Sequence, residues 1–414
     1  MSMTQTQQLN VPALRFPEFS REWLQERLGS YFTFKNGVNA EKSAYGQGHK
    51  FINVLDIITD RPIKSENIIG SVSISDKEIE KNRVVYGDIL FQRSSETREE
   101  VGQSNVYLDR EKPATFGGFV IRGHPRKDFS SEFFHSLLKT MKVRKDMTSR
   151  SGGSTRYNVG QESLSQTSVS VAPSLHEQQK IASFLSSVDC KIAQLDKKKA
   201  LLEQYKKGMM QKLFSGELCF KDAQGNDFPD WEEKRLGEIA DFTGGGTPET
   251  GKPEYWGGEV QWFTPTEIKK KYLLDSKRSI TREGLKKSSA KLLPVGTLLL
   301  STRATVGDVA IAQRECSTNQ GFQSLQVNPS EYNEFWYYWI LRNKKTLLRR
   351  SSGSTFLEIS KSEIAKIKTT KPCFEEQQKI ADFLSSIDRK IELAATEIDY
   401  AKSFKKGLLQ QMFI

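Results

Sequence analysis

One long segment occurs twice in this chain, and both copies have the same length. The sequence QQKIASFLSSVD at residues 178–189 returns as QQKIADFLSSID at residues 377–388, with ten of twelve positions identical at an offset of 199. At the same offset, KKGMMQKLF at residues 206–214 returns as KKGLLQQMF at residues 405–413. Because nothing was inserted or deleted between the two ends, we expect the segment to be an unbroken, rigid element.

Apolar residues in both copies follow the alternating spacing of four and three that is typical of a coiled coil. The first stripe comprises Ile181, Leu185, Val188, Ile192, Leu195, Leu202, Met209 and Leu213, and it is interrupted by Lys199 and Lys206. The second comprises Ile380, Leu384, Ile387, Ile391, Ala394, Ile398, Ala401, Leu408 and Met412. The pattern predicts a helix of roughly 39 residues, about 58 Å long, over residues 176–214. Each stripe needs a partner, which the other copy supplies; two independent helices packed on their own domains are the alternative.

The repeat extends to a whole half of the protein. Residues near the start return at an offset of 208, where Trp23, Arg27, Leu28 and Gly29 correspond to Trp231, Arg235, Leu236 and Gly237. The linker after the first helix, residues 215–230, reaches at most about 53 Å. If the helices were parallel, the linker would have to span almost its whole reach to bring the second domain back to the far end of the first helix. If they are antiparallel, the linker needs to span almost no distance. The sequence therefore predicts an antiparallel pair with a globular domain beyond each end and a pseudo-two-fold axis.

Between the tryptophan and the long helix of each half, short apolar runs alternate with Gly and Asn, which is typical of a β core. Each half adds one helical segment, residues 130–147 and 334–350. The aromatic residues of the second, Phe335, Trp336, Tyr338 and Trp339, fit helix-core packing better than base stacking. The predicted fold is α+β, with two mixed globular domains separated by a coiled-coil spacer. Its boundaries are residues 1–172 and 217–370 for the domains and 173–216 and 371–414 for the helices.

The overall charge favours a polyanionic partner. The chain has 62 Lys and Arg against 51 Asp and Glu, for a net charge of +11, which by itself does not identify the polyanion. The four cysteines, Cys190, Cys219, Cys316 and Cys373, form no CxxC pair, so neither a zinc site nor a disulfide framework is expected. The first residues do not resemble a signal peptide and no apolar run is long enough to span a membrane, so we expect a cytoplasmic protein without membrane attachment.

No group of residues in the sequence matches the pattern of a catalytic site convincingly. The segment GTPETGK at residues 246–252 contains most of a phosphate-binding loop, but such a loop requires Ser or Thr next and the start of a helix. Pro253 follows instead. The carboxylates Asp230 and Glu232 are too close in sequence to come from the two adjacent strands of a nuclease metal site. The sequence therefore favours a binding protein over an enzyme.

Polar and basic residues follow a predicted strand at the same place in both halves. The first half offers Arg93, Ser94, Ser95, Thr97 and Arg98, and the second offers Ser301, Thr302, Arg303 and Thr305. Arg pairs bidentately with guanine, and Ser or Thr bonds base edges or phosphates. Solvated strand ends with local salt bridges are the alternative, but recurrence in both halves favours DNA contact. Gly- and Ser-rich loops add the candidates Ser154, Thr155, Arg156, Tyr157, Ser354 and Thr355, which suit phosphate oxygens, although ordinary turns explain them about as well.

Several of these segments together resemble the specificity subunit of type I restriction-modification systems. They are GGGTPETGKPEYWGGEVQWFTPTEI, LPVGTLLLSTRATVGDVAIA, NQGFQSL, GSTFLEISKSEI and EEQQKIADFLSSIDRKIE. The first half resembles a different recognition-domain subtype through VVYGDILFQRSSETREEVGQSNVY and GGFVIRG. The resemblance covers essentially the whole chain.

The resemblance implies that each globular domain is a target recognition domain that reads one half of a bipartite, asymmetric sequence in double-stranded DNA. It adds Thr247, Thr264, Thr266, Asn319 and Gln320 to the candidate DNA contacts. The helix pair would fix the spacer length and dock two methyltransferase subunits, for which Gln178, Gln179, Phe184, Gln377, Gln378 and Phe383 are candidates. Restriction-translocation subunits would add to that core. Catalytic residues and cofactors are not expected in this chain; S-adenosylmethionine, ATP and Mg²⁺ would belong to the partner subunits.

Two other classes of function stay open at this stage. One is a single-chain DNA-modifying enzyme, disfavoured because no cofactor motif is found. The other is a coiled-coil scaffold that does not bind DNA. The salt dependence of DNA binding distinguishes a DNA-binding protein from such a scaffold, because phosphate contacts make DNA affinity fall steeply with ionic strength.

Overall fold

The computed structural model describes residues 10–353 and 357–414, and it divides the chain into two compact units. The first unit comprises residues 1–196 and 396–414, and the second comprises residues 197–395. Each unit therefore combines one globular domain with parts of both long helices.

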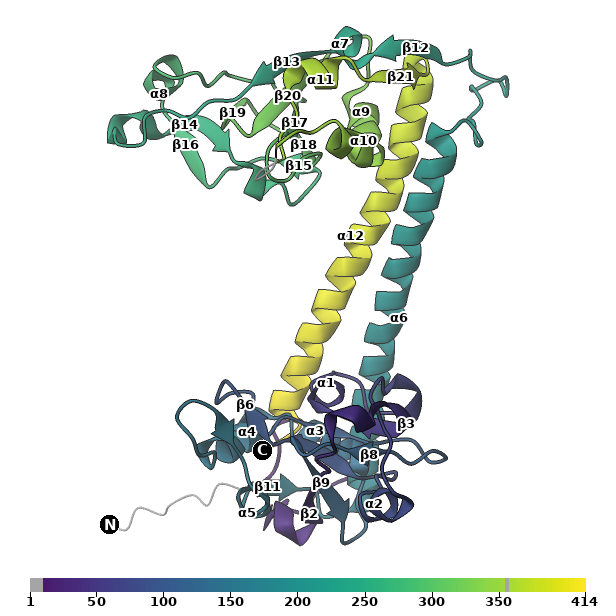
Figure 1. Cartoon of the computed structure of the whole chain (residues 1–414), viewed down its shortest axis with the longest axis vertical. Coiled ribbons are helices and arrows are strands. Elements are labelled where there is room, and N and C mark those ends of the chain that lie inside the picture. The colour runs from purple at the N-terminus through teal and green to yellow at the C-terminus, as the bar shows by residue number, and fades with distance from the viewer. Residues whose placement is uncertain (1–9, 354–356) are drawn as a thin grey trace. The chain divides into compact units, whose positions relative to one another are not determined.

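The two long helices are α6 (Leu175–Phe214) and α12 (Phe374–Gln411), drawn in teal and yellow in Figure 1. In the first unit, Ile181 and Leu185 near the start of α6 share a core cluster with Leu408 and Met412 near the end of α12. The second unit has the reverse arrangement, in which the end of α6 packs on the start of α12 around Leu213. The helices are thus antiparallel, and the predicted apolar stripes face each other.

An ion pair between matched positions joins the helices in each unit. In the first, the Lys405 Nζ lies 2.6 Å from an Asp189 carboxylate oxygen, and in the second the Lys206 Nζ lies 2.6 Å from Asp388. These are the same two positions of the repeat with the helices exchanged, since both pairs differ by the offset of 199. Opposite charges at matched positions favour this antiparallel register over neighbouring ones.

The first globular domain contains two main sheets. The strand orders are β2-β9-β5-β7 and β4-β3-β8, and a short ladder β1-β11 lies at the start of the long helix. A two-stranded ladder, β6-β10, carries part of the candidate site. The strands are β1 (Leu24–Arg27), β2 (Phe32–Asn36), β3 (Tyr45–Ile52), β4 (Ser71–Val72), β5 (Ile89–Gln92), β6 (Ser94–Ser95), β7 (Ser104–Val106), β8 (Thr115–Phe116), β9 (Val120–Pro125), β10 (Tyr157–Asn158) and β11 (Ser168–Val171). The helices are α1 (Val54–Ile57), α2 (Asp76–Lys81), α3 (Ser131–Leu137), α4 (Met141–Ser149) and α5 (Gln161–Ser165), with short 3₁₀ helices at Leu28–Ser30, Lys42–Ala44 and Ser65–Asn67.

The second globular domain repeats this plan with one more strand in its larger sheet. The orders are β13-β20-β17-β18-β15, β16-β14-β19 and β12-β21. The strands are β12 (Glu232–Arg235), β13 (Ala240–Gly244), β14 (Trp256–Phe263), β15 (Tyr272–Leu273), β16 (Arg278–Ile280), β17 (Leu298–Ser301), β18 (Val309–Ala312), β19 (Cys316–Thr318), β20 (Phe322–Val327) and β21 (Lys368–Lys371). The helices are α7 (Leu236–Ile239), α8 (Arg282–Lys286), α9 (Asn333–Arg342), α10 (Lys344–Arg349) and α11 (Lys361–Ala365), with 3₁₀ helices at Pro253–Tyr255 and Pro265–Glu267.

Each globular domain holds the start of one long helix and the end of the other in the same way. The Trp23 indole Nε1 donates to Glu177 at 3.1 Å, and Trp231 donates likewise to Glu376. The rings of Phe133 and Phe413 lie 5.3 Å apart in the first unit. Phe335 and Phe214, their counterparts, lie 5.2 Å apart in the second. The repeated tryptophans therefore mark the contact that fixes each domain to the helix pair.

The helical segments predicted inside each domain exist but are each divided in two. Residues 130–147 form α3 and most of α4, separated by Thr140, whose extended backbone ends the first run. The aromatic helix α9 confirms the expectation of core packing. Its rings are buried in the core cluster that also receives α12; the buried aromatic residues are Phe335, Trp336, Tyr337, Tyr338 and Trp339.

Candidate nucleic-acid interface

In each domain, the candidate residues gather around a turn that connects two sheets. In the first domain this turn spans residues 117–120, and in the second it spans residues 319–322. The Gly117 N–H donates to Ile52 and the Val120 N–H to Gly117. The Asn319 N–H donates to Phe263 and the Phe322 N–H to Asn319. The two turns are therefore equivalent, at an offset of 202.

The segment after β5 lies directly against the first of these turns. The Arg93 N–H donates to the Phe119 carbonyl at 2.8 Å, and its guanidinium reaches the Gly118 carbonyl at 3.3 Å. Ser94 pairs with Asn158 of β10, and the Ser94 Oγ donates to the Asn158 side chain at 2.5 Å. Ser95 is buried and donates to Glu100 at 2.8 Å. The structure thus brings these residues together with the Gly- and Ser-rich loop, two segments that the sequence offered as separate candidates.

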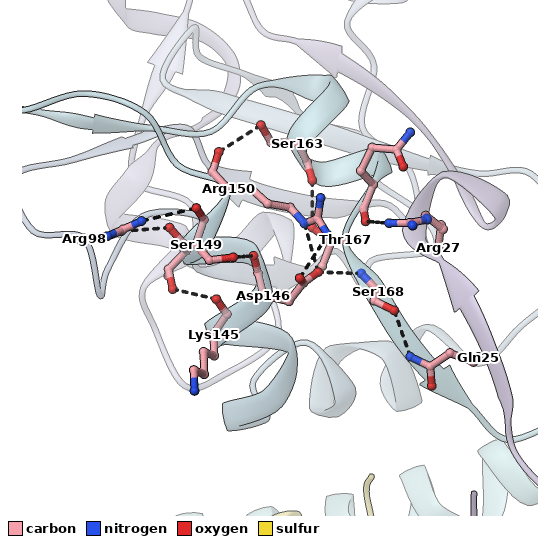
Figure 2. A network of polar contacts seen from close by, with 12 residues as sticks. Gln25, Arg27, Arg98, Lys145, Asp146, Ser149, Arg150, Ser163, Thr167 and Ser168 are labelled. Carbon is pink, nitrogen blue, oxygen red and sulfur yellow. Dashed lines mark hydrogen bonds and ion pairs between the residues drawn. The ribbon is translucent and has the colours of Figure 1, made fainter.

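Arg98 is exposed, but its guanidinium already has partners within the protein. Its guanidinium donates to the backbone carbonyls of Thr148 and Ser149 at the end of α4, at 3.2 and 3.3 Å (Figure 2). A cation at this position donates to carbonyls of the last helical turn and is favourable at the negative end of the helix dipole. This contact, across 50 residues of sequence, gives Arg98 a structural role, and its DNA contact stays a prediction.

A hydrogen-bonded network below the loop holds its base in position. The Asp146 carboxylate accepts from Arg150 at 3.1 Å and from the Ser168 N–H at 2.8 Å. The Ser163 Oγ donates to the Arg150 carbonyl, so α4, α5 and β11 are tied together (Figure 2). Since this network fixes both ends of the loop, its exposed side chains are presented by a rigid base.

The exposed side of this loop contributes to an open pocket of about 340 Å³. Arg156 lines it together with Gln92, Ser94 and Phe119; the complete lining is Val54, Gln92, Ser94, Ser95, Glu96, Glu100, Phe119 and Arg156. Of the remaining candidates, Thr97, Ser154 and Thr155 are exposed and Tyr157 is half-buried in β10. Donors, acceptors and both signs of charge are present here, as in a surface that reads base edges.

The second domain collects its candidates around the equivalent turn. The Thr247 Oγ donates to the Gln320 side chain at 2.5 Å, and the Thr264 and Thr266 hydroxyls lie 3.1 Å apart. The Asn319 N–H donates to Phe263, the residue before Thr264. The residues that the resemblance added to the candidates therefore form one cluster, although they come from three separate segments of sequence.

Arg303 is exposed but already has a partner. Its Nη2 lies 2.7 Å and its Nε 3.0 Å from the same carboxylate oxygen of Glu358. Ladder geometry makes this pair the counterpart of Ser94 and Asn158, since a β-bridge joins Arg303 to Glu358. Glu358 was not anticipated, because the sequence gives no sign that a residue 55 positions away faces Arg303. The carboxylate positions the guanidinium and leaves its other nitrogen for a ligand.

The remaining candidates of this segment differ in accessibility. Ser301 and Thr302 are buried; the Ser301 hydroxyl lies 2.9 Å from that of Thr305, and the Thr302 N–H donates to Gly321. This burial gives them a role in holding the turn, in place of the direct contact expected from the sequence. Thr305 itself is exposed. Ser354 and Thr355 lie outside the described residues.

The segment GTPETGK forms the edge of this cluster and does not cradle a phosphate. The Gly246 N–H donates to Thr318 at 2.8 Å, while its carbonyl accepts from the Trp262 indole at 2.9 Å. Lys252 pairs with Glu249 at 3.2 Å. Both backbone groups of Gly246 are therefore used in packing, and Lys252 has an acidic partner.

Two of the docking candidates are internal clamps. Gln178 is buried, donates to the Ala172 carbonyl at 2.8 Å and accepts from the Ser130 N–H at 3.0 Å. Gln377 is buried in the same way and accepts from the Tyr332 N–H at 2.9 Å. Their amides satisfy backbone groups where the long helices begin, so burial assigns them a structural role in place of the docking role expected from the sequence.

The other docking candidates lie on the outer side of the helix starts. Gln179 is exposed and Gln378 half-buried. The Phe184 ring packs edge-on against Phe16 at 5.9 Å, and Phe383 packs on Phe220 at 5.7 Å. Both phenylalanines are thus partly covered by the segments that lead into their own domains.

Within residues 10–353 and 357–414, no group of three or more His, Cys, Asp and Glu residues is arranged to hold a metal ion. A search of that same part of the chain finds no helix long and apolar enough to cross a membrane.

Comparison with known families gives two matches along this chain. The family model described as the type I restriction modification DNA specificity domain matches residues 21–204 and again residues 229–402. The two matched regions correspond to the two halves of the internal repeat.

Curated relatives include two proteins of Methanocaldococcus jannaschii. The type I restriction enzyme MjaIX specificity subunit is 35% identical over 209 residues, covering 49% of this chain and 48% of that protein. The putative type I restriction enzyme MjaX specificity subunit is 26% identical over 418 residues, covering 97% of this chain and 95% of that protein. The chain thus matches about half of the first relative and nearly all of the second.

Two solved structures share the fold. The S subunit of a type I restriction-modification system from M. genitalium superimposes with a TM-score of 0.58 at 16% identity, covering 98% of this chain and 99% of that one. A chain from a structure on complex assembly and conformational transition of the type I R-M system gives 0.58 at 18% identity, covering 94% and 97%.

Proposed function

We propose a mechanism of DNA recognition for this chain, which belongs to the type I restriction modification DNA specificity family. Each globular domain reads one half of a bipartite, asymmetric sequence in double-stranded DNA. The helix pair sets the spacer between the half-sites and docks the methyltransferase subunits. The chain contributes recognition and no catalysis of its own.

The observation that carries this proposal is the contrast within each unit between a repeated frame and a variable turn. The helix ion pairs, the Trp–Glu bonds and the turn hydrogen bonds recur in both units. The side chains on the turn do not recur: Gly117 and Gly118 stand where the second domain has Asn319 and Gln320. Two readers on one frame, with different chemistry, suit two different half-sites.

Exposed apolar pairs on the long helices support two equivalent docking surfaces. In the second unit, Leu201 and Tyr205 are 55% and 51% exposed on α6. In the first, Tyr400 and Phe404 are 74% and 57% exposed on α12, at the same positions of the repeat. Residues four apart share one helix face. A partner that binds twice through one surface fits these pairs, as two copies of a methyltransferase subunit would.

The proposal assigns the chemistry to the partner subunits. S-adenosylmethionine would be bound by the methyltransferase subunits, and ATP and Mg²⁺ by the restriction-translocation subunits. The net charge of +11 supports a DNA partner for this chain through phosphate contacts.

The test is to combine the chain with its methyltransferase subunits and map the methylated adenines along genomic DNA. We expect one bipartite sequence with a fixed spacer. Methylation at a single uninterrupted motif, or without sequence preference, would overturn the proposal. Affinity for DNA that does not fall with added salt would point instead to a scaffold.

A further inference from the structure

We propose that Phe119 reads a thymine in the half-site of the first domain, through contact between its ring and the thymine methyl group. The inference rests on the DNA-recognition function proposed above, and it adds a specificity-determining residue that lies at the turn of residues 117–120.

The backbone around Phe119 is rigid. The Gly117 N–H donates to Ile52 at 3.0 Å, the Gly118 N–H to Val38 at 2.9 Å, and the Val120 N–H to Gly117 at 2.9 Å. The Phe119 carbonyl accepts from Arg93 at 2.8 Å. A tight approach of the turn to its surroundings adds to this, because a Cβ on Gly118 would lie 1.9 Å from the Asn39 side chain. The backbone is thus held in place on both sides of the aromatic residue.

This rigid turn presents a large apolar side chain to solvent. Phe119 is 59% exposed, while its neighbours Phe116 and Val120 are fully buried. Fixing an exposed phenyl ring gains nothing from burial in the free protein. A backbone that holds an aromatic residue at a fixed place before binding, however, lowers the entropic cost of association. Such preorganisation points to an external ligand.

The surroundings of the ring identify the class of ligand. Phe119 shares its pocket with Gln92, Ser94 and Arg156, which offer hydrogen-bond groups and a positive charge. The carboxylates of Glu96 and Glu100 line the same pocket and add hydrogen-bond acceptors. The Gln92 side chain is 6% exposed, and its Oε1 has no hydrogen-bond partner within the part of the chain that the structure describes. Hydrogen-bonding groups beside one apolar contact match the edge of an A·T pair in the major groove, where the thymine methyl is the apolar feature.

The second domain provides an internal comparison. Equivalent hydrogen bonds, from Arg93 to Phe119 and from Thr302 to Gly321, show that Gly321 occupies the place of Phe119. A Cβ at Gly321 would lie 2.9 Å from the Pro265 ring, so no larger side chain fits there. The second turn instead carries Asn319 and Gln320. The equivalent turns therefore offer an apolar side chain in the first domain and amide side chains in the second.

Matching sequence letters alone would have hidden this residue. Alignment of GGF at residues 117–119 with QGF at residues 320–322 pairs Phe119 with Phe322, which is buried in the core. The backbone ladder shifts this pairing by one position and pairs Val120 with Phe322. Phe119 is therefore an exposed aromatic residue at a position where the second domain has Gly321.

The test uses the complete methyltransferase complex and a duplex that carries its mapped target. Each thymine of the first domain's half-site is replaced in turn by deoxyuridine, which lacks only the methyl group. The dissociation constants of the wild-type complex and of the Phe119→Ala complex are measured for every duplex. We expect one replacement to weaken wild-type binding about fourfold, the factor that burial of one methyl-sized group supplies. The same replacement should leave Phe119→Ala unaffected.

Two further variants separate this contact from other effects. Phe119→Leu retains an apolar side chain and should keep part of the discrimination. Met141→Ala removes an exposed apolar side chain at the start of α4 that does not line the pocket of Phe119, and it should respond to deoxyuridine as the wild type does.

The inference is overturned if Phe119→Ala weakens all duplexes equally, if both complexes respond alike to deoxyuridine, or if that half-site contains no thymine. DNA binding that is unchanged in Phe119→Ala, together with impaired complex assembly, would identify a protein ligand and overturn it as well. Failure of the proposed function looks different, because the wild-type complex would then have no bipartite target at all.

Discussion

The two units contain the same helix ion pair in different surroundings. In the second unit, Asp388 accepts from Lys206 and also from the Tyr338 hydroxyl, at 2.6 Å. In the first unit the place of Tyr338 is taken by Ser136, and Asp189 pairs with Lys405 near a second cation, Lys139. A second cation lies near the ion pair in the second unit as well, where Lys271 is close to Lys206 and Asp388. The two units therefore differ in the hydroxyl, which Tyr338 adds to the pair of the second unit.

This difference shows which parts of the repeat were free to change. The paired charges and apolar stripes determine the register of the helices, and they are retained in both copies. The groups that each globular domain contributes around the pair have diverged, as have the side chains on the two turns. A frame with fixed register tolerates different domains at its ends, provided that each domain keeps its tryptophan and its clamp glutamine.

The largest effect is expected from changing helix length. One heptad inserted in both helices, after Lys197 in α6 and after Thr396 in α12, should keep both ion pairs and lengthen each helix by about 10.5 Å. We expect both half-sites to be retained with a spacer about three base pairs longer. The measurement is the map of methylated adenines.

The control for this experiment is the same insertion in α6 alone. It places one ion pair and part of the apolar seam out of register, so specific methylation should be lost. An unchanged spacer after the paired insertion would refute the spacing role of the helices.

Replacing one candidate DNA contact in a domain should affect only the half-site that this domain reads. Arg303→Ala should relax one base pair of the second domain's half-site, with a loss of discrimination of about 1 to 3 kcal/mol. Ser94→Ala, at the equivalent position of the first domain, should have a smaller effect on the other half-site. Methylation profiling of both variants measures this, and an unaltered target for Arg303→Ala contradicts the role assigned to it.

Removing the acid of each ion pair should cost unequal amounts of stability. Asp388→Ala leaves both Lys206 and the Tyr338 hydroxyl without that partner and should lower the free energy of unfolding by about 2 kcal/mol. Asp189→Ala removes a more exposed carboxylate with fewer contacts and should cost about 1 kcal/mol. Urea unfolding of the purified chains compares them, and equal losses would show that Tyr338 adds nothing.

The smallest effect concerns pH. Burial, together with the nearby charge of Lys405, lowers the pKa of Lys139 to about 8 from its ordinary value of 10.5. The unfolded chain then binds more protons between these two pKa values, so the stability of the first unit should rise as the pH increases through this range. Lys139→Leu, which installs the residue found at Leu341, should abolish this rise and stabilise the chain at pH 7 by on the order of 1 kcal/mol.

Unfolding temperatures at pH 7 and 9.5 provide the measurement. Lys142→Leu, which removes an exposed lysine of α4, serves as the control. If Lys139→Leu retains the wild-type pH dependence, another group is responsible.

Sequence reasoning succeeded for the frame because its signals are local or repeated. The apolar stripes predicted the helices α6 and α12, and the short linker predicted their antiparallel order. It was less successful at the candidate interface. Ser301 and Thr302 are buried, Arg98 is bound to the end of α4, and Gln178 and Gln377 are clamps. Their burial and contacts depend on how strands and helices pack, which the local sequence does not encode.

The sequence by itself determined the helix pair, the two-domain repeat and the approximate position of the candidate turns, since period, duplication and chain length are properties of the sequence alone. Only the tertiary structure decided which side chains are available on those turns. Accessibility depends on how strands pair: a shift of one residue in the ladder places Phe119 in solvent and Phe322 in the core.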